Sequence, residues 1–250
     1  RYSFVIYRKH LSAYAVFAGS DFDIEHALEA ALQGTREVDF KKLRELANLQ
    51  PILAKRHFHE TGTLRWFEVD IAPVDELSNR AKNFQPLKGS VGLFLLSIPT
   101  DNESREEIIE ACKNAIEIKA IDERESAATP IICGLSDQAV TIIQNARELI
   151  AMDTVRLESP ELAGDEIARR EVQARIAALQ NSLETALATA FDTTDWMDRD
   201  HSLQRLKFSE MSALASEIAA RVFTKAPILH NELLNRHRPS SSAVAAQNAL

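Results

Sequence analysis

The stretch RHFHETGTLRWF, from Arg56 to Phe67, is the most unusual of the chain, because it brings two histidines, a glutamate and two arginines together. If it forms a strand, His57 and His59 lie on one face, because alternate side chains of a strand point the same way. Together with Glu60 they offer ligand types that zinc accepts, but no further ligand is indicated. A solvated edge with hydrogen-bonded histidines explains the stretch more simply, and we predict no metal site.

Four arginines are candidates for contact with a nucleotide or another phosphate. Arginine pairs bidentately with phosphate oxygens, so Arg56 and Arg65 could hold an anion at a subunit boundary. Arg236 and Arg238 stand on either side of His237, near the end of an expected helix. Positive charge there also complements the negative end of a helix, which explains these residues without a ligand.

A second polar cluster, PTDNES, follows an apolar run. In open α/β sheets, ligands bind beyond the carboxyl ends of the strands, where Asp101, Asn102 and Glu103 could bind a cation. An Asp or Asn that caps the next helix accounts for the same residues, and we favour the cap. An enzyme of unfamiliar type, using the strand ends near Asp101 and Ser136, stays open as an alternative.

The two common glycine-rich nucleotide loops, G-x-x-x-x-G-K-[ST] and G-x-G-x-x-G, do not occur in the 250 residues. Both loops follow a strand, whereas Gly89 and Gly92 precede one, so we interpret these glycines as a turn. We expect no cofactor in this chain, and ATP with Mg²⁺ only in a longer polypeptide.

Two buried strands are expected to position these groups. Ser90–Pro99 and Pro130–Leu135 are near-continuous apolar runs, as in strands covered on both faces. A helix from Glu103 to about Ile118 separates them, and this succession predicts adjacent parallel strands joined right-handedly. The segment from Leu64 also has strand composition.

Helices are expected before and after these strands in the sequence. Residues 2–18 have a mixed pattern that favours a buried helix, and two short helices should follow, one after Ser20 and one capped by Asp39. After Ser136 the chain reads as helical throughout, including a helix over 202–223.

A long helix should run from about Pro160 to Phe191. Its apolar seam should be buried against the helices that follow, and a free coiled coil is the lesser alternative. The seam consists of Val172, Ile176, Leu179, Leu183, Ala186 and Ala190, and the opposite, wet face of Arg169, Arg170, Gln173, Gln180 and Glu184.

The predicted fold class is α/β followed by α. It comprises a small helical module of winged-helix or lid-like type over 1–52, a small α/β unit with a short parallel βαβ sheet over 53–136, and long helices over 137–250. Cys112 and Cys133 lie in apolar surroundings and are expected to be reduced core thiols of a cytoplasmic protein.

The net charge of −8 makes a freely acting nucleic-acid binder less favoured, although a local basic patch could still serve one. No apolar run approaches the roughly 20 residues that a membrane span needs, so no membrane partner is expected. Because the chain opens at Arg1 in a sequence typical of the middle of a structured segment, we expect it to be part of a longer protein.

Four stretches together resemble large bacterial P-loop ATPases of phage-defence islands, of the BREX type or related, in the region that follows the ATPase core. They are GSDFDIEHAL at 19–28, RHFHETGTLRWFEV at 56–69, ARELIAMDTVRLESPELAGDEIARREVQARI at 146–176 and APILHNELLNRHRPSSSAVAAQNAL at 226–250. The Walker motifs of that family are missing, so no catalytic residue is carried over. The resemblance implies a non-catalytic segment whose partners are the ATPase domain of the same polypeptide and other subunits of a defence complex, with nucleic acid as a further partner. A stand-alone protein-binding module with a helical interaction surface is the alternative.

Overall fold

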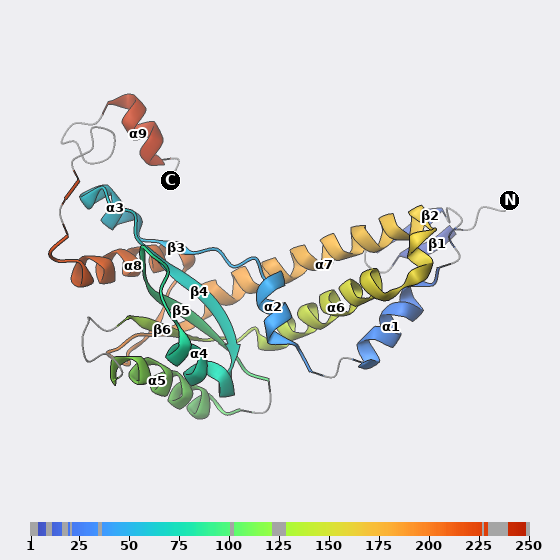
Figure 1. The fold of residues 1–250 in the computed structure, drawn as a ribbon, viewed down its shortest axis with the longest axis horizontal. Coiled ribbons are helices and arrows are strands. Elements are labelled where there is room, and N and C mark those ends of the chain that lie inside the picture. Colours follow the sequence, from blue (N-terminus) through green and yellow to red (C-terminus); the bar gives the residue numbers. More distant parts are fainter. Residues whose placement is uncertain are drawn as a thin grey trace. The chain divides into compact units, whose positions relative to one another are not determined.

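The computed structural model describes residues 5–8, 12–16, 20, 22–34, 37–100, 103–121, 129–226, 228–229 and 240–248 (Figure 1). The chain forms two compact units, each assembled from two stretches of sequence. One comprises Arg1–Asn48 with Val140–Ala188, and the other Leu49–Ala139 with Thr189–Leu250. The segments predicted from sequence are consecutive, whereas each unit draws on distant parts of the chain.

The first unit opens with a hairpin of two antiparallel strands, β1 (Val5–Arg8) and β2 (Ala13–Val16). Tyr7 and Tyr14 pair across it, with ring centroids 5.2 Å apart. The prediction of a helix over 2–18 is therefore wrong for the described residues. β-Branched and aromatic side chains favour strand, and they outweigh the loose helical spacing.

Helices make up the rest of this unit: α1 (Ile24–Gly34), α2 (Phe40–Leu46), most of α6 (Ala139–Glu158) and most of α7 (Glu166–Thr193), with a 3₁₀ turn, η3 (Pro160–Ala163), between the last two. The predicted cap Asp39 is confirmed, since its carboxylate accepts the backbone N–H groups of Lys41 and Lys42. Asp23, rather than Ser20, caps α1 by accepting the N–H of His26.

The seam of α7 forms much of the core of the first unit. Val172 and Leu183 are buried, and the half-buried Ile176 and Leu179 pack with Val172 against apolar residues of α1, α6 and η3. The seam is confirmed, but these partners precede α7, so the prediction that it packs on later helices is wrong. Gln180 is not wet either: it is half-buried and donates a 2.6 Å hydrogen bond to the carbonyl of Leu46.

The second unit is built on a six-stranded sheet in the order β3-β4-β5-β6-β7-β8. The strands are β3 (Ile52–Leu53), β4 (Trp66–Pro73), β5 (Ser90–Ile98), β6 (Ile131–Leu135), β7 (Asp195–Met197) and β8 (Leu203–Arg205). β4, β5 and β6 are parallel, and the outer pairings are antiparallel. The predicted parallel pair is confirmed, with Leu95 opposite Cys133.

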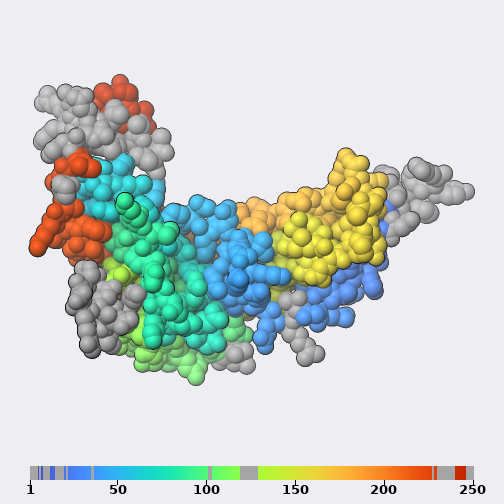
Figure 2. Space-filling view, in the orientation of Figure 1, coloured from blue at the N-terminus to red at the C-terminus, as the bar shows by residue number. Residues whose placement is uncertain are grey.

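One face of the sheet is covered by α4 (Leu77–Asn83) and α5 (Arg105–Ile121), with the 3₁₀ turn η2 (Val74–Glu76). In Figure 2 the atoms of these helices belong to the teal-to-green part of the surface. Cys112 of α5 and Cys133 of β6 are buried in it as free thiols. A hydrogen bond to Cys112, together with burial, raises the pKa of the Cys133 thiol well above its ordinary value.

The opposite face carries a row of aromatic rings. Phe94 lies edge-on to both Phe67 and Trp196, with centroids 5.2 and 5.3 Å apart, and Phe191 from the last turn of α7 stacks on Trp196. Burial of such rings contributes strongly to a core, and the edge-on geometry adds to it. This row ties β7 to the parallel strands.

Three segments differ from expectation. Lys55–Thr61 forms a helix, α3, where a strand edge was expected. The strands β7 and β8 fall in the region predicted to be wholly helical, and α8 begins only at Phe208 and ends at Val222. Strands of three residues leave too short a pattern to outweigh the helical periodicity around them. A last helix, α9 (Ser241–Asn248), follows.

Candidate ligand pocket and strand-end groups

The polar groups at the carboxyl ends of the parallel strands are engaged with one another. Asp195 lies opposite Leu135 at the end of β6. Its carboxylate accepts a hydrogen bond of 2.7 Å from the guanidinium group of Arg105 and one of 3.0 Å from that of Arg205. The hydrogen bond from Arg105 and then that from Arg205, which outweigh the effect of burial, hold the pKa of Asp195 below its usual value. This carboxylate is therefore an ionised partner of two arginines.

Other polar side chains at these strand ends also make hydrogen bonds within the unit. Asp137 accepts the hydroxyl of Thr193 at 2.7 Å, and Ser136 accepts the N–H of Gln138 at 3.2 Å. Ser104 caps α5 in reciprocal hydrogen bonds with Glu107, so the expected Asp or Asn cap is wrong. Asp101 and Asn102 lie outside the described residues, and Glu103 accepts the N–H of Thr100.

His57 and His59 do not share a face, because α3 is a helix and a spacing of two places them on different sides. His57 is 3% exposed, and neither of its ring nitrogens has a hydrogen-bond partner among the described residues. Burial, and then the charge of Arg65, lower the pKa of His57, with a smaller opposing effect of Glu60. The expectation of hydrogen-bonded histidines is therefore wrong for His57. Within the described ranges no three His, Cys, Asp or Glu side chains gather closely enough to hold a metal ion.

The arginines proposed as phosphate contacts lie on separate elements. Arg56 is exposed on α3, where its backbone N–H donates to Ser216 of α8 at 3.1 Å. Arg65 lies just before β4 with its guanidinium 4.2 Å from the centroid of the Phe223 ring, a cation–π contact. Arg236 and Arg238 lie outside the described residues.

The glycines that precede β5 divide between turn and strand. Gly89 lies in the turn, with φ at 103°, as expected. Gly92 is inside β5, so its assignment to the turn is wrong. A side chain on Gly92 would meet the carbonyl of Pro130, which precedes the neighbouring strand β6, so the close approach of the two chains explains this glycine.

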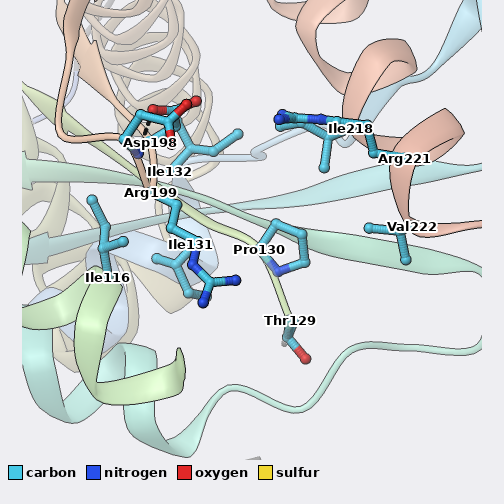
Figure 3. Close-up of a pocket in the computed structure, with 11 residues that line it drawn as sticks. Ile116, Thr129, Pro130, Ile131, Ile132, Asp198, Arg199, Ile218, Arg221 and Val222 are labelled. Carbon is cyan, nitrogen blue, oxygen red and sulfur yellow. Dashed lines mark hydrogen bonds between the residues drawn. The ribbon is translucent and has the colours of Figure 1, made fainter. Parts of the chain in front are cut away.

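A pocket of about 410 Å³ opens at the amino end of β6, the edge of the sheet opposite to the groups around Asp195 (Figure 3). The end of α5, the start of β6, the turn after β7 and the end of α8 line it. The lining residues are Ile116, Thr129, Pro130, Ile131, Ile132, Asp198, Arg199, Asp200, Ile218, Arg221 and Val222.

The pocket combines an apolar floor with charged groups at its rim. Ile116, Ile132 and Ile218 are 5%, 1% and 5% exposed, so the floor is part of the packed core. Arg199 and Arg221 are exposed and, within the described part of the chain, make no hydrogen bond or ion pair through their guanidinium groups. Sequence reasoning missed this pocket because its residues come from four separate stretches and form no motif.

No protein family model matches this chain, and neither a curated protein nor a solved structure shows significant similarity to it. Among the helices of the described residues, none combines the length and the hydropathy needed to cross a lipid bilayer.

Proposed function

We propose that this chain is a non-catalytic segment of a large cytoplasmic ATPase of the antiphage-defence kind. It would couple a nucleotide domain elsewhere in the polypeptide to the engagement of a partner protein or nucleic acid. The proposal rests on the family resemblance of the sequence, and one structural observation supports the non-catalytic part.

That observation concerns the sheet edge where α/β proteins bind ligands. Asp195 is held there by Arg105 and Arg205, and Asp137 by Thr193. These hydrogen-bonded side chains have a structural role in the sheet unit. The sequence also has no glycine-rich phosphate-binding loop. ATP chemistry would then depend on residues elsewhere in the polypeptide.

The coupling role would fall to the helices of the first unit. Residues 1–52 would serve as the winged-helix or lid-like module, a role with which the hairpin β1–β2 and the short helices α1 and α2 are compatible. The helix α7 has residues in both units, up to Ala188 in one and from Thr189 in the other.

Calorimetry with Mg-ATP tests the proposal directly. The chain should give no heat of binding at micromolar concentrations and release no phosphate above the rate in buffer. Micromolar binding, or turnover, would overturn the non-catalytic assignment.

The alternative is a stand-alone protein-binding module, and the apolar pocket favours it, with two arginines at its rim that have no partner among the described residues. The two functions differ in their partner. If the chain binds the ATPase domain of its own polypeptide in a mixing experiment, the coupling segment is supported. Binding only to unrelated proteins would support the module instead.

A further inference from the structure

The arginines at the pocket differ from others in the same unit. Arg105 and Arg205 share Asp195, and Arg80 pairs with Asp70. Arg199 and Arg221 have no such partner among the described residues, and Figure 3 shows them reaching the pocket from different elements, Arg221 from α8 and Arg199 from the turn after β7. Positive charge beside an apolar floor can attract the acid group of a ligand whose body is apolar.

The acidic residues at the rim restrict the charge of that ligand. The carboxylate of Asp198 accepts the N–H of Asp200 at 3.0 Å, so it is held within its own turn. Both carboxylates would repel a dianion such as a phosphate more strongly than a group with one negative charge. The rim therefore favours a single carboxylate.

We propose that this pocket binds a small carboxylic acid with an apolar body. The apolar part would lie on Pro130, Ile132 and Ile218, and the positive charges of Arg199 and Arg221 would attract the carboxylate at the rim. A volume of about 410 Å³ lies toward the small end of known ligand pockets. The same chemistry belongs to a free apolar acid and to the C-terminal residue of a peptide. The proposal does not depend on the ATPase role, and its test involves no nucleotide.

Calorimetry with matched probes tests the chemistry and its source. Phenylbutyrate represents the free acid, and an acetylated peptide that ends in Leu-Leu with a free carboxylate represents the C-terminus. Phenylbutanol and the amidated peptide lack the charge, and inorganic phosphate lacks the apolar body. At least one of the two acids should bind with one-to-one stoichiometry, about ten-fold more tightly than its neutral counterpart and than phosphate. Preference for phenylbutyrate identifies a free acid, and preference for the peptide identifies a C-terminus.

Substitutions at the rim locate the binding. Arg199→Gln and Arg221→Gln should each weaken the acid about ten-fold and leave the neutral probe unchanged. Lys88→Gln removes one exposed charge of the same unit outside the pocket and should change nothing. Since both arginines are exposed, the far-UV spectrum and melting temperature of each variant should match the parent protein. Equal acid affinity in all variants, equal binding of acid and neutral probes, or no binding of either acid at millimolar concentration would overturn the proposal.

Discussion

His57 is held in its neutral form by its surroundings. Its ring is buried, neither nitrogen has a described hydrogen-bond partner, and Arg65 adds positive charge nearby. A buried imidazolium without a partner loses its hydration, so burial lowers the pKa of His57 below its ordinary value of 6.5. The fold therefore prefers conditions in which this residue is uncharged.

A pH dependence of stability follows. The unfolded chain takes up a proton at His57 near pH 6.5, while the folded chain does so only at lower pH. The contribution of His57 to stability is thus complete above pH 6.5 and is lost as the pH falls toward the folded pKa. Chemical unfolding at about pH 7.5 and about pH 5 should show this loss, and His57→Leu should reduce it. His26→Gln, an exposed histidine of α1, is the control, and an unchanged pH slope in His57→Leu would contradict the assignment.

Gly134 in β6 is needed for close packing of its neighbours. A methyl group added there would lie 2.7 Å from the Thr194 side chain and 2.7 Å from the Trp196 ring. Gly134→Ala should therefore destabilise the protein by roughly 1–3 kcal/mol, because the core must shift to admit it. Gly164→Ala is the matched control, since nothing lies within 4 Å of its added carbon. Urea unfolding measures both, and equal effects of the two substitutions would argue against a packed contact at Gly134.

At the scale of elements, α7 shows which features a sequence pattern can predict. The spacing of its seam identifies the buried face, because helical periodicity is local. It does not identify what covers that face, because the partners α1 and α6 are chosen by the whole chain. The role of Gln180 is hidden for the same reason, since its hydrogen bond reaches Leu46 in a distant part of the sequence.

Three substitutions in α7 separate these contributions. Leu183→Ala should cost about 2–5 kcal/mol, because the side chain is fully buried. Gln180→Ala should cost about 1 kcal/mol, because the hydrogen bond to Leu46 is lost. Gln173→Ala, at an exposed position, should cost little. Helix content followed by circular dichroism during urea unfolding gives the three values, and a mild Leu183→Ala would mean that the seam is not core.

Some strands of the sheet can be predicted from the sequence pattern, and others cannot. β5 and β6 are visible in the sequence because every residue of each is buried, which leaves a continuous apolar run. β7 and β8 have three residues each, too few for a local pattern. β7 is held by its pairing with β6 and by the packing of Trp196, and β8 by its pairing with β7. The pocket at the amino end of β6 could not be predicted either, because the pairing of β6 with β7 brings Arg199 to it while Arg221 comes from α8, in a different part of the sequence.

At the scale of the whole molecule, each unit combines two stretches that are distant in the sequence. Each therefore has its own core: one contains Met152, Val155 and Val172, and the other the buried faces of the sheet. Both tryptophans, Trp66 and Trp196, belong to the unit with the sheet. Tryptophan fluorescence thus reports on that unit, whereas far-UV circular dichroism reports on the helices of both.

Separate cores predict separate responses to core substitutions. Met152→Ala removes a fully buried side chain of the helical unit and should lower its stability by about 2–5 kcal/mol. The urea midpoint from circular dichroism should fall, while the midpoint from fluorescence should stay near that of the parent protein. Leu95→Ala, a fully buried residue of β5, should lower the fluorescence midpoint. Two probes that always shift together would mean that the units unfold as one cooperative body, since coincident transitions are the mark of two-state unfolding.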